Sequence, residues 1–410
     1  MQQLAVKIAG KQSHNIAIGG FTMRTNTIQV GFAALSIGVL LISACGGGGG
    51  TTTGTTTGTT TVLSAYVANY GDGTISQYTI NPSTGALTPK IPATVVSIAG
   101  NASSYPTSII VDQAGKHAYV ANNGDYVISQ FNIGPGGVLV PMTPAATVQS
   151  GSGPISIAIH PSGKYAYAAN SYSNDISQFN VDPVTGALTP MAPPTVTPCY
   201  PATTCTQGIW PISITVGPSG AYVYVVNQSD NSVSQFIIGP SGALTPMGTA
   251  TVAAGTTPSS ITIDPSGNFA YVTNYLATPN ASITQFSITS GALTSSTSSG
   301  LGSALTLPTS MAIDPSGTHA YVANGTGIYP FTINASGLLD NMNPINPTGG
   351  TAPQSVAIDS LGKFVYVANK GSDNISQFNI GAGGTLSTPT VTQGATGSQP
   401  YSITTAVLKL

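Results

Sequence analysis

A tyrosine-centred phrase of four residues recurs seven times between residues 63 and 410. It reads Tyr-Val-Ala-Asn with small changes, and successive copies start 45 to 57 residues apart. A repeat of this length fits one blade of four short strands in a β-propeller. The count therefore predicts seven blades, with copies starting at Tyr66, Tyr119, Tyr167, Tyr224, Tyr271, Tyr321 and Tyr366.

The fifth copy shows the longer pattern of each repeat. Turn residues separate four runs of β type, at residues 258–264, 269–274, 282–288 and 291–294. The third run carries apolar side chains on both faces, which is expected where neighbouring blades cover both sides of a sheet. A glutamine recurs in this run in six copies, with Pro330 in its place in the sixth blade. Its repetition indicates hydrogen bonding between blades.

The two ends of the repeat region complement each other. The first copy begins at residue 63, at its second strand, and residues 400–406 match the first-strand phrase. Pairing these segments would remove the open edges of an unclosed ring. We therefore predict an all-β, seven-bladed β-propeller over residues 63–410, closed by a C-terminal strand that joins the N-terminal blade. An elongated β-solenoid, the alternative, would not need complementary ends.

The composition supports an all-β fold. Only 5% of the residues are charged, all eleven acidic residues are Asp, and the only Arg is Arg24. The scarcity of Glu, Lys and Arg argues against extensive helix. It also argues against a nucleic-acid partner, because phosphate binding needs clustered cations.

Residues 23–45 resemble a bacterial lipoprotein signal. A short positive start at Met23 precedes an apolar stretch and small residues before Cys45. The resemblance implies a signal peptide over residues 1–44 and lipid on Cys45, followed by a Gly/Thr-rich linker over 45–62. Translation from Met23 is left open. A transmembrane helix, the alternative, would need about twenty apolar residues. We expect a protein lipid-anchored in the bacterial cell envelope, periplasmic or surface-exposed.

Aspartates and histidines recur at fixed places in the repeat. One Asp series ends first strands and another lies between second and third strands, so turn chemistry is favoured over acid or calcium sites. The histidines are not expected to converge on one zinc ion. The sequence predicts no metal and no cofactor. These residues are Asp112, Asp264, Asp314 and Asp359; Asp72, Asp125, Asp175, Asp230 and Asp373; and His117, His160 and His319.

The candidate binding face carries the linkers between blades and the turns between second and third strands. Cys199 and Cys205 lie on one linker with five residues between them, and in an exported protein they predict a local disulfide. Trp210, Tyr200 and Tyr275 are the ligand-binding candidates on this face. They could stack on a sugar or a peptide, whereas Trp210 could equally plug the channel mouth.

The tetrad Tyr-Val-Thr-Asn at residues 271–274 resembles the YVTN family of β-propeller repeats of bacterial and archaeal surface proteins. More loosely, the chain resembles seven-bladed lactonase-like propellers. The resemblance covers residues 63–410 and implies the propeller fold. The tetrad itself carries no chemistry.

Two functions remain. The first is a non-catalytic, monomeric envelope module that binds a glycan, a peptide or an envelope protein. The second, implied by the lactonase resemblance, is hydrolysis of a sugar lactone, as in the 6-phosphogluconolactonase-like family. Members of that family are expected to use carboxylates, histidine and cations, but this chain has no Glu and no Arg beyond residue 24. We therefore assign no catalytic residue.

Overall fold

The computed structural model describes residues 13–18, 21–26, 61–98, 101–198, 209–276, 282–296, 305–325, 327–342, 347–392 and 397–409. The chain divides into two compact units, Met1–Thr57 and Gly58–Leu410. In the first unit, β1 (Ser13–Ile18) pairs antiparallel with β2 (Phe21–Asn26). The predicted lipidation site Cys45 lies outside the described residues. No helix in the described part of the chain is long and apolar enough to cross a membrane.

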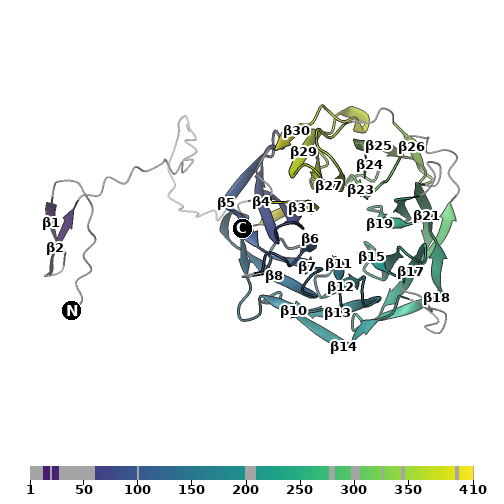
Figure 1. Cartoon of the computed structure of the whole chain (residues 1–410), viewed down its shortest axis with the longest axis horizontal. Coiled ribbons are helices and arrows are strands. Elements are labelled where there is room, and N and C mark those ends of the chain that lie inside the picture. Colours follow the sequence, from purple (N-terminus) through teal and green to yellow (C-terminus); the bar gives the residue numbers. More distant parts are fainter. Residues whose placement is uncertain are drawn as a thin grey trace, which may run out of the picture. The chain divides into compact units, whose positions relative to one another are not determined.

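The second unit is a ring of seven antiparallel blades, as predicted (Figure 1). Within each blade the strands follow one another outward from the centre. Blade 1 contains β31 (Pro400–Lys409), β3 (Thr61–Asn69), β4 (Thr74–Ile80) and β5 (Leu87–Val96). Blade 2 contains β6 (Pro106–Val111), β7 (His117–Asn122) and β8 (Val127–Ile133), and both β9 (Leu139–Pro141) and β10 (Thr147–Gln149) pair with β8.

The remaining blades have four strands each. Blade 3 contains β11 (Pro154–Ile159), β12 (Tyr165–Asn170), β13 (Asp175–Val181) and β14 (Leu188–Val196). Blade 4 contains β15 (Pro211–Val216), β16 (Tyr222–Asn227), β17 (Ser232–Ile238) and β18 (Leu244–Ala253). Blade 5 contains β19 (Pro258–Ile263), β20 (Phe269–Asn274), β21 (Ile283–Thr289) and β22 (Ala292–Ser296).

Blade 6 contains β23 (Ser310–Ile313), β24 (His319–Asn324), β25 (Gly327–Ile333) and β26 (Leu339–Asn341). Blade 7 contains β27 (Pro353–Ile358), β28 (Phe364–Asn369), β29 (Asn374–Asn379) and β30 (Thr390–Thr392). Two short 3-10 turns, η1 (Pro135–Gly137) and η4 (Ala382–Gly384), connect third to fourth strands.

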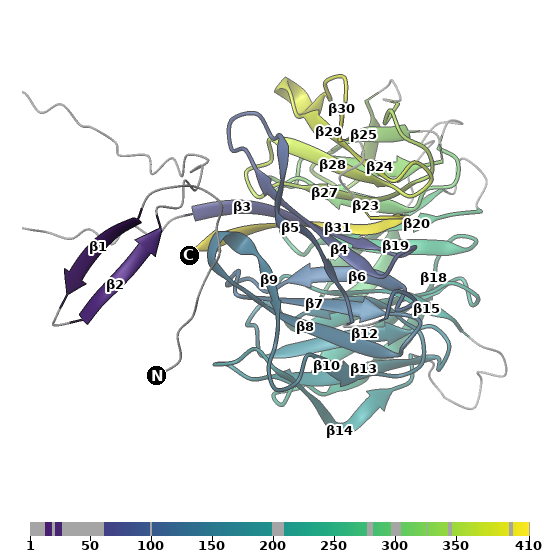
Figure 2. The same ribbon diagram turned by 60° about the vertical axis from the view of Figure 1, so that its left-hand side comes forward.

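Strand β31 closes the ring, which confirms the predicted closure. It pairs antiparallel with β3 from Thr61 opposite Lys409 to Asn69 opposite Pro400. Figure 2 shows the two strands side by side. Strand β31 also contacts the first strands of blades 2 and 7, namely β6 and β27. All seven first strands therefore surround one central channel.

The tyrosine of each tetrad fastens its blade to the next. It is fully buried, and its hydroxyl donates a hydrogen bond of 2.6 to 2.9 Å to a glycine carbonyl of the following blade. These glycines have φ of +72° to +83°, and a Cβ on them would lie 2.1 to 2.6 Å from a side chain of the preceding blade. Only glycine fits both demands. The acceptors are Gly137, Gly186, Gly242, Gly291, Gly337, Gly384 and Gly85.

The recurring glutamine makes a second contact between blades, as predicted. In five blades its side-chain oxygen accepts a hydrogen bond of 2.6 to 2.9 Å from the backbone N–H of a leucine that is the first or second residue of an outer strand in the next blade. In blade 7, Gln377 instead donates to the carbonyl of Thr84 in blade 1. Pro330 leaves β25 continuous as a strand but lacks this side-chain amide. The repeated Tyr and Gln therefore serve to hydrogen-bond each blade to its neighbour.

Candidate functional site

A β-bulge near the start of the first strands shapes one mouth of the channel. In six blades the pairing with the second strand shifts between the opening proline and the serine two residues later. A bulge leaves one residue unpaired and can re-aim its side chain. In all six of these blades that residue lines the channel mouth: Thr107, Ile155, Ile212, Ser259, Gln354 and Tyr401.

A serine in each first strand, which follows the bulge where one is present, links the inner strands to one another. In six blades its Oγ accepts a hydrogen bond of 3.2 to 3.4 Å from a backbone N–H of the next blade's first strand. The seventh, Ser260, pairs instead with the hydroxyl of Thr273. Hydroxyl groups on hydrogen-bonded strands therefore line the channel mouth. The serines are Ser108, Ser156, Ser213, Ser260, Ser310, Ser355 and Ser402.

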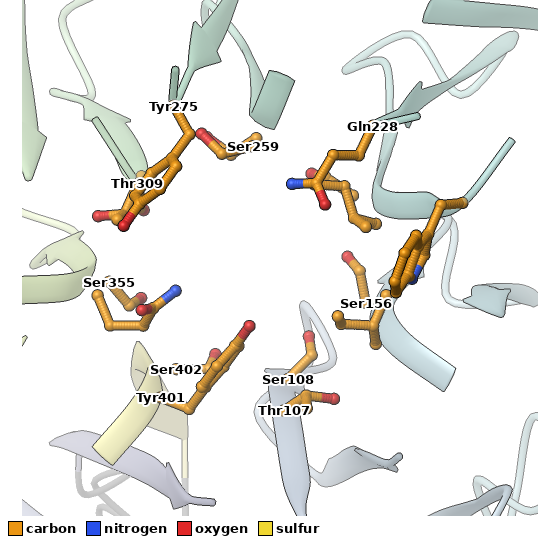
Figure 3. A pocket seen from close by; sticks show the side chains of 17 residues that line it. Thr107, Ser108, Ser156, Gln228, Ser259, Tyr275, Thr309, Ser355, Tyr401 and Ser402 are labelled. Atoms are coloured by element: carbon orange, nitrogen blue, oxygen red, sulfur yellow. The ribbon is translucent and has the colours of Figure 1, made fainter. Parts of the chain in front are cut away.

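These side chains enclose a cavity of about 430 Å³ at the centre of the ring. Figure 3 shows hydroxyl, amide and tyrosine side chains around it, contributed by blades on all sides. Three aromatic residues, Trp210, Tyr275 and Tyr401, lie among the lining residues, and none of the lining residues is charged or a histidine. The size and mixed lining suit a small polar ligand with one apolar face.

The residue before each inner-strand proline adopts a left-handed conformation. Its φ lies between +48° and +69°, although in six blades it is not glycine. Such backbone strain is held by surrounding structure and is frequent at binding sites. Trp210 is one of these residues, and its backbone N–H donates a hydrogen bond of 2.8 Å to the side-chain oxygen of Asn174. The others are Tyr105, Gly153, Thr257, Leu307, Ala352 and Gln399.

Lys370 is a cation on this face. It follows Asn369 at the end of β28, the position that Gln228 and Tyr275 occupy in blades 4 and 5. Its Nζ lies 5.1 Å from the ring centre of Tyr70 and 5.0 Å from that of Tyr401. Burial lowers the pKa of Lys370, and burial also raises the pKa of Tyr401. The two ring faces hold the ammonium group beside the cavity.

Two of the predicted ligand-binding residues line this cavity. Trp210 is 46% exposed and Tyr275 is 37% exposed, and they come from neighbouring blades. The third candidate, Tyr200, lies outside the described residues, as do both cysteines of the predicted disulfide, Cys199 and Cys205.

The recurring aspartates hold turns, as expected. Asp264 accepts hydrogen bonds from the backbone amides of Ser266 and Phe269. Asp112 accepts one at 2.8 Å from the ring of His117. Burial tends to raise the pKa of Asp112, but this bond and the amide of Lys116 hold it below its ordinary value. His160 stabilises its own turn, because its ring accepts a hydrogen bond from the backbone N–H of Ser162.

The histidines do not converge. His117 and His319 begin β7 and β24, where each packs on a glycine of the next blade, Gly186 or Gly384. Four other blades place Tyr or Phe there, whereas blade 1 has Ser64, so the imidazole serves mainly as a flat ring. The described residues hold no group of three or more His, Cys or Asp that could bind a metal ion.

Sequence reasoning missed Tyr401, Gln228, Gln354 and Lys370. They lie one residue after an inner-strand proline or one residue after the tetrad asparagine. Aligning the seven repeats would have shown that these two positions vary while their neighbours repeat. In a ring of repeated blades, the side chains at positions that vary between blades can determine which ligand is bound.

Comparison with known proteins gives a family and a fold. The family model described as Lactonase, 7-bladed beta-propeller matches residues 46–300 and 269–404. A comparison with curated proteins finds no match.

Several solved structures share the fold. The periplasmic gluconolactonase PpgL of Pseudomonas aeruginosa is 19% identical, with a TM-score of 0.70, covering 84% of this chain and 99% of that one. A protein of Bacteroides uniformis, provisionally assigned as a 6-phosphogluconolactonase, is 20% identical, with a TM-score of 0.69 and the same coverage. A Bacteroides fragilis protein with the same provisional assignment is 19% identical, with a TM-score of 0.70, covering 86% and 99%.

Proposed function

Because the chain belongs to the lactonase family of seven-bladed β-propellers, we propose that it binds an unphosphorylated sugar lactone at the channel mouth and hydrolyses it. The observation that carries the proposal is the cavity of about 430 Å³, which combines three aromatic rings with hydroxyl and amide groups. A sugar ring has an apolar C–H face and a polar edge, so both kinds of group have a partner.

The charge of this face favours an unphosphorylated ligand. Its turns between second and third strands carry aspartates, whereas Lys370 is the cation among the described residues there. A phosphate group would normally require two or more clustered cations. The aspartates on these turns are Asp72, Asp125, Asp175, Asp230 and Asp373.

Ring opening needs water to attack the lactone carbonyl and a donor to stabilise the oxyanion that forms. The hydroxyl of Tyr401, at the cavity wall, and the ammonium of Lys370 beside it are the groups that can supply this stabilisation. The lining residues include no carboxylate or imidazole, so the attacking water would come from solvent without a strong base.

The test is a pH-stat assay of glucono-1,5-lactone opening, corrected for the spontaneous rate, with binding measured by calorimetry on the same full-length preparation. We expect saturable acceleration that Tyr401→Phe lowers and that Leu361→Ala, an exposed change away from the lining residues, leaves unchanged. Absence of both binding and acceleration would refute the proposal.

A second function, a non-catalytic sugar receptor, is favoured by the lack of an acid–base pair in the lining. It predicts that the lactone and a non-hydrolysable cyclic sugar both bind and that Trp210→Ala weakens both, without any acceleration of ring opening.

We also propose that Cys45 carries a lipid anchor in the cell envelope, on the strength of the signal-like sequence before it. Replacing Cys45 with Ala should move the exported protein from the membrane fraction to the soluble fraction. Retention of this variant in the membrane fraction would contradict the anchor.

A further inference from the structure

Five tyrosines form a second feature of the mouth face, beyond the cavity lining. The ring of Tyr70 lies 5.6 Å from that of Tyr401 and stacks on that of Tyr105 at 4.9 Å. Tyr126 and Tyr172 meet edge to face at 6.3 Å. We call Tyr401, Tyr70, Tyr105, Tyr172 and Tyr126 the tyrosine arc.

The arc spans three blades. Tyr401 and Tyr70 belong to blade 1, Tyr105 and Tyr126 to blade 2, and Tyr172 to blade 3. Asn123 links the two groups of rings, because its backbone N–H donates a hydrogen bond of 3.0 Å to the carbonyl of Tyr105 and its side-chain oxygen accepts one of 3.1 Å from the hydroxyl of Tyr172. Tyr401 is both the inner end of the arc and part of the cavity wall. The arc therefore leads away from the cavity over the blade edges.

The rings are held in place yet accessible. The hydroxyl of Tyr172 donates to the side-chain oxygen of Asn123 at 3.1 Å, and its ring lies over Gly153, where a Cβ would come within 2.6 Å of it. Tyr105, Tyr126 and Tyr172 are nevertheless 37%, 39% and 54% exposed. Ordered aromatic rings offer a partner contact area at little entropic cost. Exposed rings gathered in one place usually mark an interaction surface.

The surroundings of the arc select the class of partner. Asp72, Asp125 and Asp175 lie on the turns of the same three blades. Lys370, which packs on the inner end of the arc, is already held between the rings of Tyr70 and Tyr401. This arrangement disfavours polyanions such as nucleic acids and acidic polysaccharides, because both need free cations. Flat rings with hydroxyl groups at their edges match the C–H faces and hydroxyl edges of successive sugar units.

We propose that the tyrosine arc is a binding track for an uncharged glycan chain, with successive sugar units packed on its exposed rings Tyr105, Tyr172 and Tyr126. The arc goes beyond the proposed lactone site and does not depend on it, because four of its five rings are outside the cavity lining. At the positions equivalent to Tyr70 and Tyr105, blade 6 carries Gly325 and Leu307, and blade 7 carries Lys370 and Ala352. The track therefore does not continue into these two blades.

The experiment is a screen of the full-length protein on an array of neutral, acidic and amino-sugar glycans of increasing length, followed by calorimetry with the bound series. We expect binding of neutral chains that strengthens from two units to five. Tyr172→Ala should weaken binding of the longest chain about tenfold and leave glucono-1,5-lactone binding unchanged. Tyr105→Ala should act in the same way.

Leu361→Ala is the matched control, because Leu361 is 56% exposed and lies in the turn after β27, away from the arc. No binding of neutral chains, affinity independent of chain length, or equal losses for Tyr172→Ala and Leu361→Ala would each overturn the glycan track. Loss of lactone binding alone would count only against the cavity proposal. Retained lactone binding with no glycan binding would count only against the track.

Discussion

Position 217 is unusual among the residues that end first strands. Five other blades place Asp or His there to cap the following turn, whereas blade 4 has Gly217. A cavity of about 260 Å³, lined by Gly217, Tyr222, Tyr224 and residues of blade 5, lies beside it. A Cβ on Gly217 would have its nearest neighbour 3.7 Å away, at the carbonyl oxygen of Tyr222. The site therefore has room for the missing carboxylate.

We predict that Gly217→Asp raises the free energy of unfolding by about 1 kcal/mol, because the carboxylate can accept turn amides as Asp264 does. Urea denaturation measures the change. Gly217→Ala is the control, since it restricts the unfolded chain without restoring those hydrogen bonds. Equal stabilities of the Asp and Ala variants would contradict the explanation.

Lys90 is a second exception at the scale of one residue. It is 7% exposed and occupies the place of Met142 and Met191 in the repeat. Its Nζ donates to the carbonyl of Gly136 at 2.7 Å and to the hydroxyl of Thr79 at 3.1 Å, without a carboxylate among these partners. Burial lowers the pKa of Lys90 to about 8.

Lys90→Met should therefore stabilise the protein by about 1–2 kcal/mol below pH 8, where the folded protein must bury the ammonium group. Between pH 8 and about 10.5 the unfolded chain still binds this proton while the folded protein has released it. The stability of the wild type rises with pH over this window, so the advantage of the variant shrinks. Chemical denaturation of both proteins at pH 7 and pH 9.5 measures the difference. An advantage independent of pH would contradict the role of the charge.

Neither exception follows from the sequence alone. The repeat shows that residues 90 and 217 deviate from the other blades, but the consequence depends on what surrounds each side chain. Lys90 could have been exposed on an outer strand. Instead, Lys90 is buried by packing between two blades, and the repeat pattern does not predict this packing.

At the scale of strands, the repeat predicts both the four strands of each blade and the closing C-terminal strand. The bulge at the start of six of the first strands is not evident, because Pro-x-Ser is also typical of an ordinary strand. That bulge turns Tyr401 and Gln354 toward the channel and thereby determines the candidate site. Trp210 and Tyr275 could be proposed from their loops, but the convergence of the lining side chains requires the ring geometry.

We predict that a chain lacking residues 400–410 does not fold cooperatively, because β3 would be left as an open edge. A synthetic peptide of residues 400–410 added in trans should restore the fold and lactone binding. A peptide with Ile403→Asp should not, since Ile403 is 5% exposed in the core between blades 1 and 7. Circular dichroism with thermal melting measures each mixture. Cooperative melting of the truncated chain alone would contradict the prediction.

At the scale of the whole molecule, the seven buried tetrad tyrosines act together. Burial raises the pKa of each, so the folded protein keeps protons that the unfolded chain releases above about pH 10. The unfolded state then binds fewer protons, and stability falls as pH rises.

We expect cooperative unfolding between about pH 10 and pH 12, recorded by circular dichroism at constant salt. Tyr167→Phe lacks the hydroxyl bonded to Gly242. Its unfolding should therefore release one proton fewer, and its transition should depend less steeply on pH. It should also lose about 1 kcal/mol at pH 7. An unchanged proton count in this variant would show that other groups drive the alkaline transition.

The pairing of β31 with β3 also sets an order on biosynthesis. Blade 1 contains the earliest propeller strands to be made, yet its innermost strand is the last, so it remains incomplete until the other six blades have been synthesised. A product interrupted before residue 400 would keep an unpaired β3 edge open to aggregation or proteolysis. Ring closure therefore separates chains in which β3 is paired on both sides from chains in which one of its edges stays exposed.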